Sequence, residues 1–368
     1  MKWLLIAFIC TLTMSCSSSD VKSKATAEKK TEIANSEKIQ FLEIEKLIIT
    51  PNADGHRDFI NAILEAKEII QLKVFHLTDN EVIEALIKAK GNGVLVQVIL
   101  DRKSMILGKF KKAYKKLLEN KIEVYKSTKK FSITHEKSML VDHKMAFVTA
   151  INLTKNAHQT RDFGIMTSNK DIISEMELVF KTDVSNSINN QGLTPELVSP
   201  FLIWSPVNSR DKIIHLIEAA TKTIDLEVEN LGDLEIQKAL IEAAEKNVEV
   251  RLLVPLCDKN FNPFHNISYI KKMTAEKILA RVMSSPSTIE NPYMHSKMIV
   301  VDGRYIYIGS INFSNNSTQK ARELGIIFSN DKVAHQILEE FRKDWDISVL
   351  LPKDRSRIKC FKDMKGSL

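Results

Sequence analysis

An internal repeat limits the folds open to this chain more than any other feature of its sequence. Each copy contains a helix, a strand, a second helix and a second strand, identified by apolar residues at helical or alternating spacing. These segments lie at residues 58–66, 70–74, 79–90 and 94–100 of the first copy and at 211–219, 224–228, 234–245 and 248–254 of the second. The repeat predicts an α/β fold with two pseudo-symmetric α/β/α halves, each a mixed sheet flanked by helices, and an active site at their interface.

The repeat also sets the expected domain boundaries. The first half covers residues 39–199, the second covers 200–352, and a basic tail follows at 353–368. With 44% hydrophobic and 27% charged residues, the 368-residue chain is globular, which excludes a fully disordered or collagen-like protein. Its net charge of +7 favours anionic partners, either phospholipid headgroups or nucleic acid.

The N-terminus has the pattern of an export signal. One lysine precedes an apolar run at residues 3–14, which is too short to span a bilayer, and small polar residues follow. Cys16 resembles the acylated cysteine of bacterial lipoproteins, although Thr13 replaces the usual aliphatic residue. We expect a signal peptide at 1–15, a lipid on Cys16 and a flexible tether over 16–38, which would hold an exported protein on a membrane of the cell envelope. Secretion without a lipid is the alternative.

The chain has four cysteines, and two of them belong to the export segment. The other two, Cys257 and Cys360, are open to two interpretations. They form a disulfide in an oxidising compartment, or they are two free thiols.

Each half carries a histidine and a lysine two residues apart in an apolar alternating segment, the spacing that places both side chains on one face of a strand. An aspartate follows five residues after the lysine, and an asparagine ten residues after the aspartate. The set is His135, Lys137, Asp142 and Asn152 in the first half, and His295, Lys297, Asp302, Ser310 and Asn312 in the second.

These residue types suit the cleavage of a phosphodiester. A lysine supplies positive charge to the nonbridging phosphate oxygens, and an imidazole attacks phosphorus or transfers a proton near neutral pH. Asp142 and Asp302 are expected to orient the imidazoles. Asn152, Asn312 and Ser310 are expected to donate hydrogen bonds to the phosphate. One half holds an incomplete set, whereas two facing halves supply a nucleophile, an acid and two lysines.

The two segments match the H-x-K-x4-D-x6-G-S-x-N motif of the phospholipase D superfamily, and the chain resembles its members with two motifs in one chain. The resemblance covers nearly all of the chain after the tether. It implies a covalent phosphohistidine mechanism without metal or cofactor, in which His135 attacks phosphorus and His295 protonates the leaving oxygen. The opposite assignment of the two histidines is the alternative. The resemblance also implies that the lysines and asparagines hold the phosphate.

Members of this superfamily carry an acidic residue after the asparagine. Glu323 matches that residue in the second half, and Asp162 is its shorter counterpart in the first, so both are expected to support the site. The first motif departs from the pattern, because Thr149 and Ala150 replace Gly-Ser. The departure bears on the symmetry of phosphate binding, and a first half that binds without catalysing is the alternative.

A strongly basic segment precedes His135. Residues 102–130 hold eleven Lys or Arg against two Glu, a local excess of nine positive charges that would suit an anionic leaflet or a DNA backbone. The alternative is an amphipathic helix at 109–118 with lysines on its solvent face. His76 and Glu229 follow equivalent strands and are expected to line the cleft.

The sequence thus predicts a phosphodiesterase that hydrolyses a glycerophospholipid at a membrane, as a monomer without an obligate protein partner. Three alternatives stay open. They are a metal-independent endonuclease acting on DNA or RNA, a phosphatidyltransferase similar to cardiolipin synthases, and a noncatalytic phosphate-binding module.

Overall fold

The computed structural model describes residues 39–156, 159–257, 266–285, 287–351 and 360. The expected signal peptide, Cys16, the tether and the basic tail, apart from residue 360, lie outside the described residues. Among the helices that are described, none combines the length and the apolar character needed to cross a bilayer.

Among the described residues, each half contains seven strands, and its helices follow the order that the repeat predicts. The first half comprises β1 (Lys46–Thr50), α2 (Arg57–Glu65), β2 (Ile69–Val74), α3 (Asn80–Gly91), β3 (Leu95–Leu100), η1 (Ser104–Ile106), α4 (Gly108–Glu119), β4 (Glu123–Lys126), β5 (Lys137–Val141), β6 (Met145–Thr149), β7 (Asp162–Thr167) and α5 (Lys170–Asn189). The second comprises β8 (Leu202–Ser205), α6 (Ser209–Glu218), β9 (Thr223–Val228), α7 (Leu234–Glu245), β10 (Glu249–Pro255), α8 (Ile267–Ala275), β11 (Leu279–Met283), β12 (Lys297–Val301), β13 (Tyr305–Gly309), α9 (Asn315–Gln319), β14 (Glu323–Ser329) and α10 (Asp331–Ile347).

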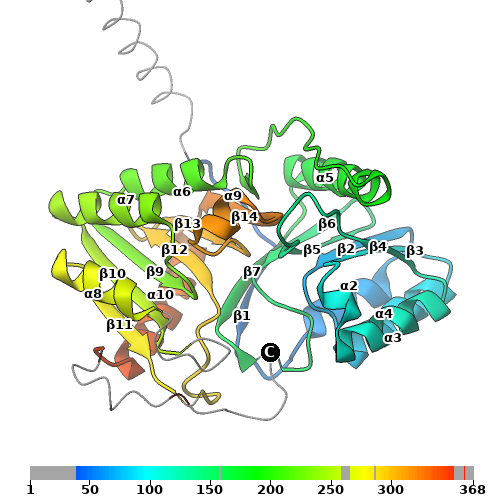
Figure 1. The fold of residues 1–368 in the computed structure, drawn as a ribbon, viewed down its shortest axis with the longest axis horizontal. Coiled ribbons are helices and arrows are strands. Elements are labelled where there is room, and N and C mark those ends of the chain that lie inside the picture. The colour runs from blue at the N-terminus through cyan, green and yellow to red at the C-terminus, as the bar shows by residue number, and fades with distance from the viewer. Residues whose placement is uncertain (1–38, 157–158, 258–265, 286, 352–359, 361–368) are drawn as a thin grey trace, which may run out of the picture. The chain divides into compact units, whose positions relative to one another are not determined.

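The two sheets have the same topology. The first has the order β1-β7-β6-β5-β2-β3-β4, and the second has the equivalent order β8-β14-β13-β12-β9-β10-β11. In each, the strands joined by helical crossovers are parallel and the strands joined by hairpins are antiparallel. Figure 1 shows the two sheets side by side, with α3 and α4 at one end of the molecule and α7 and α8 at the other. The predicted fold of two α/β halves, each with a mixed sheet, is confirmed.

Equivalent helices of the two halves begin at equivalent capping residues. The side chain of Asp79 accepts hydrogen bonds from two backbone N–H groups of the first turn of α3, and Asp233 does the same for α7. Asn169 and Asn330 cap α5 and α10 in the same way. These side chains satisfy backbone donors that a helix leaves unpaired at its start, so they fix where each helix leaves its strand.

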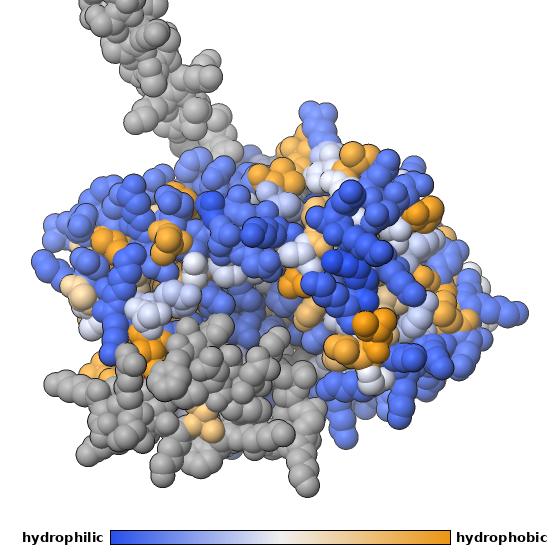
Figure 2. Space-filling model, viewed as in Figure 1, coloured by the Kyte–Doolittle hydropathy of each residue, from blue (hydrophilic) through white to orange (hydrophobic). Residues whose placement is uncertain are grey.

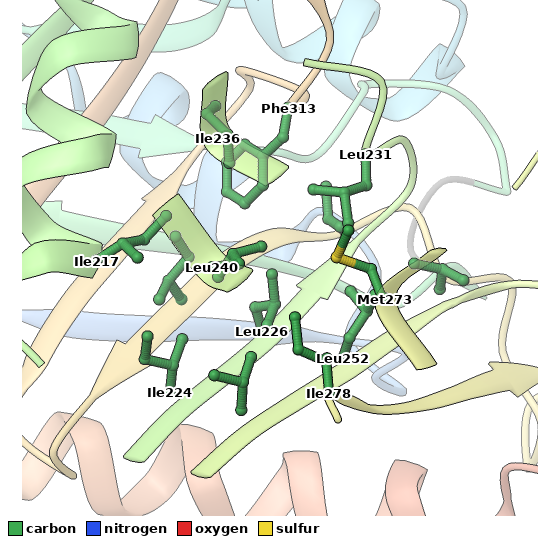
Figure 3. Packing of buried hydrophobic residues seen from close by; sticks show 14 of the residues in the cluster. Ile217, Ile224, Leu226, Leu231, Ile236, Leu240, Leu252, Met273, Ile278 and Phe313 are labelled. Atoms are coloured by element: carbon green, nitrogen blue, oxygen red, sulfur yellow. The ribbon is translucent and has the colours of Figure 1, made fainter. Parts of the chain in front are cut away.

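Three hydrophobic clusters hold the layers together. One lies between the first sheet and α2, α3 and α4, and a second lies between the second sheet and α6, α7 and α8. Figure 3 shows the second of these, in which Ile217, Leu240 and Met273 from the helices meet Leu226 and Leu252 from the strands. The third cluster contains residues from both halves and both long helices, α5 and α10. Because it combines the inner faces of both sheets, the halves share a core and fold as one body.

A buried arginine from each half forms an ion pair with the long helix of the other half. Arg322 donates from Nε to Asp183 on α5 at 3.0 Å, and Arg161 donates from Nε to Asp344 on α10 at 2.5 Å. Lys73 also reaches Asp183, at 2.6 Å. An unpaired charge at such a buried position would be costly, so these pairs specify how the two halves dock.

Cys257 and Cys360 form a disulfide in the structure, with their Cα atoms 5.9 Å apart. This resolves the question that their number and spacing left open. The bridge joins Cys360 of the C-terminal tail to the segment that follows β10.

The face of the molecule drawn in Figure 2 is mostly polar, and the hydrophobic residues on it form separate groups within a hydrophilic surface. Exposed apolar side chains are common on folded proteins, and the large ones here include Ile106, Leu107 and Ile188.

Candidate active site

The two histidines lie just before the central strands β5 and β12, and the two lysines are the first residues of those strands. Strand β5 pairs with β2, and β12 pairs with β9. Each motif therefore lies at the end of its sheet where β2 or β9 terminates. All four side chains are buried, with His135 only 7% exposed and His295 only 5% exposed. The predicted motif strands therefore place both His-Lys pairs in the interior, on equivalent sides of the two halves.

Short backbone bridges between the halves bring the two motifs together. Thr134 pairs with Arg322 of the other half, and His135 N–H donates to the Arg322 carbonyl at 2.9 Å. The second motif repeats the arrangement, because Met294 pairs with Arg161 and His295 N–H donates to the Arg161 carbonyl at 3.2 Å. The residue after each arginine is the acidic residue of that half, so the bridges set each histidine beside a carboxylate of the other half.

Each imidazole is hydrogen-bonded to that carboxylate. His135 Nδ1 lies 2.8 Å from Glu323 Oε2, and His295 Nδ1 lies 2.9 Å from Asp162 Oδ1. Both carboxyl groups are fully buried. A carboxylate at Nδ1 fixes the tautomer and the ring orientation, and it leaves Nε2 as the nitrogen directed away from the carboxylate. The two acidic residues predicted to support the site therefore orient its histidines across the interface.

Burial changes the protonation of two groups at this site. It lowers the pKa of the Lys137 ammonium to about 7, an effect that nearby Lys297 reinforces and the Glu323 carboxylate opposes. Burial raises the pKa of Glu323 to about 8, against the influence of Lys137 and of hydrogen bonds from Ser317 and Ser310. Two buried lysines close together favour an anion beside them, so the site is electrostatically prepared for a phosphate.

The lowered pKa of Lys137 predicts different pH dependences for kcat/KM and kcat. The phosphate needs a charged ammonium, so we expect kcat/KM to fall as pH rises through about 7 in the free enzyme. A bound phosphodiester anion favours the charged form, so the fall in kcat is expected at higher pH. Profiles measured on a soluble short-chain phospholipid would test this. A fall in kcat/KM and in kcat at the same pH would contradict this prediction. Lys137→Arg, in which the side chain keeps its charge, is the control.

The structure corrects the role predicted for Asp142 and Asp302. The Asp142 carboxylate accepts backbone N–H bonds from residues 67, 68 and 69 at 2.7, 2.8 and 3.0 Å. Asp302 accepts the equivalent bonds from residues 221, 222 and 223 at 2.9, 2.8 and 2.9 Å. Each aspartate follows the far end of β5 or β12, one strand length from its histidine. The motif aspartates therefore hold the loop that enters β2 or β9, and they do not orient an imidazole.

We therefore expect Asp142→Asn to affect stability and to leave catalysis nearly unchanged. Partial burial opposes ionisation, but the three N–H donors hold the pKa of Asp142 below its usual value, so the carboxylate is the form that the fold selects. Asparagine tolerates the positive φ of 53° at this position but loses the charge and one acceptor oxygen. Urea unfolding should show a loss of about 1–2 kcal/mol. A large loss of kcat at an unchanged unfolding midpoint would return Asp142 to the catalytic set.

The asparagines and Ser310 divide between two roles. Asn312 Nδ2 lies 3.3 Å from Glu229 Oε2 at the second motif, and Asn152 is buried beside the first. Neither asparagine Oδ1, an acceptor, has a hydrogen-bond partner among the described residues, and the Asn312 Nδ2 donor faces Glu229. The Ser310 hydroxyl instead exchanges hydrogen bonds of 3.2 Å with the backbone of Leu324 and also stabilises the Glu323 carboxylate. Ser310 thus positions the carboxylate.

The residues around the first motif make room for the threonine that replaces the glycine of the motif pattern. A Cβ at Gly309 would lie 2.4 Å from the Gly325 Cα on the neighbouring strand, so the second motif needs a glycine there. In the first half, Thr149 takes the equivalent place, and the facing residue Gly164 leaves room for its side chain. A Cβ on Gly164 would lie 2.5 Å from Thr149 Cγ2. The two halves therefore keep the same strand spacing with different residues.

The site is asymmetric at one position that the motifs do not include. Glu229 follows β9, and its Oε2 lies 3.0 Å from Lys297 Nζ and 3.7 Å from His295 Nε2. The equivalent residue after β2 is Phe75, whose ring lies 4.8 Å from the His135 ring and 5.4 Å from Lys137 Nζ. Equivalent strand ends predicted that Glu229 lines the site, but only the structure shows that it meets both motif residues.

Comparison with known proteins identifies a family for the chain. Residues 59–184 and 213–345 match the family described as "Cardiolipin synthase, PLD-like domain". Cardiolipin synthase 1 of Staphylococcus epidermidis is 23% identical over 340 residues, which cover 82% of this chain and 68% of that protein. Phospholipase D Z of Dictyostelium discoideum is 27% identical over 171 residues, which cover 41% of this chain and 39% of that protein.

A solved structure shows the same fold. The crystal structure of phosphatidylserine synthase from Haemophilus influenzae superimposes with a TM-score of 0.70 at 13% sequence identity, covering 89% of this chain and 92% of that one. The match to the Dictyostelium protein, by contrast, spans less than half of that protein's length. Because the family match includes both halves and both His-Lys motifs, the chain belongs to the phospholipase D superfamily, in the family of cardiolipin synthase PLD-like domains.

Proposed function

We propose that this protein cleaves the phosphodiester bond of a glycerophospholipid through a covalent intermediate on histidine, with water as the acceptor. The observation that supports this most is the pairing of each imidazole with a carboxylate of the other half. This pairing fixes two Nε2 atoms beside two buried lysines, which is the set of groups that in-line displacement at phosphorus requires.

The reaction has two displacements. In the first, His135 Nε2 forms a bond to phosphorus, the bond from phosphorus to the headgroup oxygen breaks, and His295 gives its Nε2 proton to that oxygen. In the second, His295 takes a proton from water, the water oxygen attacks phosphorus, and His135 leaves. Lys137 and Lys297 neutralise the nonbridging oxygens throughout. The products are phosphatidic acid and the free headgroup alcohol.

Glu229 supports this assignment of the two histidines. Its Oε2 lies 3.7 Å from His295 Nε2, the nitrogen that this proposal assigns to proton transfer. The first motif has the apolar ring of Phe75 at the equivalent position, 4.8 Å from the His135 ring, so the two histidines have different surroundings and suit different roles.

Phosphatidyl transfer to an alcohol is the second candidate function. Two named relatives favour it, because one is a cardiolipin synthase and a structurally similar protein is a phosphatidylserine synthase. Transfer uses the same covalent intermediate and differs only in the molecule that His295 activates. The named relatives and the family description also favour a phospholipid over a nucleic acid as substrate.

The location is part of the proposal. A lipid on Cys16 would keep the site at a membrane surface, where its substrate is found. The Cys257–Cys360 disulfide supports export, since disulfides persist in oxidising compartments.

The test is a product analysis on the full chain in the presence of a chelator. Vesicles of phosphatidylglycerol, phosphatidylethanolamine or phosphatidylcholine are incubated alone and with added glycerol, and plasmid and single-stranded DNA are incubated in parallel. Phosphatidic acid and free headgroup are the expected products. Cardiolipin or a new phosphatidyl ester would establish transfer, and cleaved DNA with intact lipid would overturn the choice of substrate. Binding without turnover would leave a noncatalytic module.

A further inference from the structure

Exposed apolar side chains lie at the turn between η1 and α4. Ile106 is 70% exposed and Leu107 is 56% exposed, and both precede the first turn of α4. The segment from residue 102 to residue 118 carries seven Lys or Arg and no Asp or Glu. An aliphatic pair surrounded by cations is typical of a surface that meets an anionic lipid bilayer.

A basic cavity lies on the same helix. It has a volume of about 310 Å³ and is enclosed by α3, α4 and the segment that follows Asn152. Four lysines line it, Lys109, Lys112, Lys116 and Lys155, and its described lining residues include no carboxylate, although the Lys116 ammonium forms an ion pair with Glu84 beside the cavity. Its other polar groups are the side chains of Thr78, Asn80, Thr154 and Asn156. A small cavity in which Lys109, Lys112 and Lys155 supplement the paired Lys116 matches a phosphate of a lipid headgroup.

The cavity and the turn are connected to the active site by aromatic stacking. Phe110 of α4 stacks on His76 with 4.2 Å between the ring centroids, and His76 stacks on Phe75 at 4.0 Å. Phe75 in turn lies 4.8 Å from the catalytic His135 ring. On the cavity side, the Leu153 carbonyl accepts the N–H groups of Thr78 and Asp79 at 2.9 and 3.0 Å, next to Asn152. The surface therefore has a fixed position relative to His135.

We propose that this surface docks the protein on an anionic phospholipid bilayer. Lys109, Lys112 and Lys155 of the cavity bind the phosphate of an anionic lipid that is not being cleaved, and Ile106 and Leu107 enter the apolar boundary of the leaflet. This inference deepens the proposed function, since it names the surface through which that site meets its substrate. The exposed aliphatic pair favours a bilayer over a nucleic acid, because a nucleic acid backbone offers no apolar environment to these side chains.

The test uses an environment-sensitive dye at one position. The full chain with Cys10→Ser and Cys16→Ser keeps the disulfide and receives a single dye at Ile106→Cys, or at Ile188→Cys as the matched control. Ile188 is 69% exposed near the C-terminal end of α5, outside the turn between η1 and α4. Vesicles of phosphatidylcholine alone are compared with an equal mixture of phosphatidylcholine and phosphatidylglycerol, and single-stranded DNA is added separately. Because the dye reports its own surroundings, insertion of the N-terminal segment elsewhere does not produce the signal.

We expect a blue shift at position 106 with the mixed vesicles, and no shift at position 188. Lys109→Gln with Lys112→Gln should weaken the vesicle-dependent signal at least about tenfold, since each lysine near an anionic surface contributes several-fold to binding. Lys238→Gln with Lys246→Gln, on α7 and at its C-cap, is the matched charge control and should leave the signal unchanged. Turnover of a soluble short-chain lipid should be the same in both double variants, because these lysines lie outside the site.

The result that overturns the proposal is an unshifted dye at position 106 with the mixed vesicles, or a shift with DNA alone, which would make this a nucleic acid surface. Docking is separable from the proposed chemistry through His135→Gln, which should bind vesicles as the parent does. If the parent docks but turns over no lipid, the proposed function fails and this inference stands. If it turns over short-chain lipid without docking, only this inference fails.

Discussion

His135→Gln should lower turnover by at least about 10⁴-fold and form no covalent intermediate, whereas His295→Gln should stop the reaction after the first displacement. His135 forms the bond to phosphorus, so without its Nε2 neither displacement begins. His295 only transfers protons. Its first role, protonation of the leaving oxygen, is not needed when the leaving group is stable as an anion. Its second role, the activation of water, has no such bypass.

A phosphatidyl ester of p-nitrophenol separates the two roles. With this substrate, His295→Gln should release about one equivalent of p-nitrophenolate in a burst and retain the labelled phosphatidyl group on the protein. The phosphorus–nitrogen bond should survive alkali and break in acid, which identifies a phosphohistidine. His335→Gln is the matched control, because His335 lies exposed on α10 and pairs with Glu339. A burst in His135→Gln and none in His295→Gln would reverse the assignment.

Glu323→Gln should reduce kcat by about 10²- to 10⁴-fold, because the amide no longer fixes the His135 tautomer. The same change should also move the pH profile. The Glu323 carboxylate opposes the effect of burial on Lys137, so its removal lowers the pKa of Lys137 below about 7. The fall in kcat/KM should therefore occur at lower pH than in the parent enzyme. A defect that is only structural would reduce activity without changing the pH at which kcat/KM falls.

Asp162→Asn is the equivalent variant of the other half and can be compared with Glu323→Gln. Asp162 holds His295, so its loss should affect slow leaving groups and spare the p-nitrophenyl ester in the first displacement. Equal losses on both substrates would contradict separate roles for the two carboxylates. Circular dichroism and a melting curve on each variant would establish that the fold is retained.

The fold could be predicted from the sequence because its determinants are local. The helix predicted at 234–245 is α7 as observed, and the other predicted helices and strands of the repeat end within one or two residues of the observed bounds. Apolar spacing and capping residues such as Asp79 and Asp233 act within a few residues, so a single sequence contains that information. Because the repeat supplies each signal twice, it also indicates that both halves have one topology.

The site was predicted in part. The histidines, lysines and acidic residues come together as expected, but the two aspartates of the motifs were assigned a catalytic role that the structure gives to Glu323 and Asp162. The reason is distance along the chain: His135 and Glu323 are 188 residues apart, and His295 and Asp162 are 133 apart. The sequence pattern within one half cannot predict a hydrogen bond to a residue of the other half. Asp142 is close in sequence to its histidine, but an extended strand separates them.

The difference between Glu229 and Phe75 gives the reaction a direction. A perfectly symmetric pair of halves would accept a phosphodiester either way round, and each orientation would be equally productive. Here a charge on one side and an aromatic ring on the other make the two ends of the substrate distinguishable. In the proposed reaction, we expect the headgroup to leave on the side of the Glu229 carboxylate and the phosphatidyl group to stay on the side of the Phe75 ring, so that only one orientation of the substrate is productive.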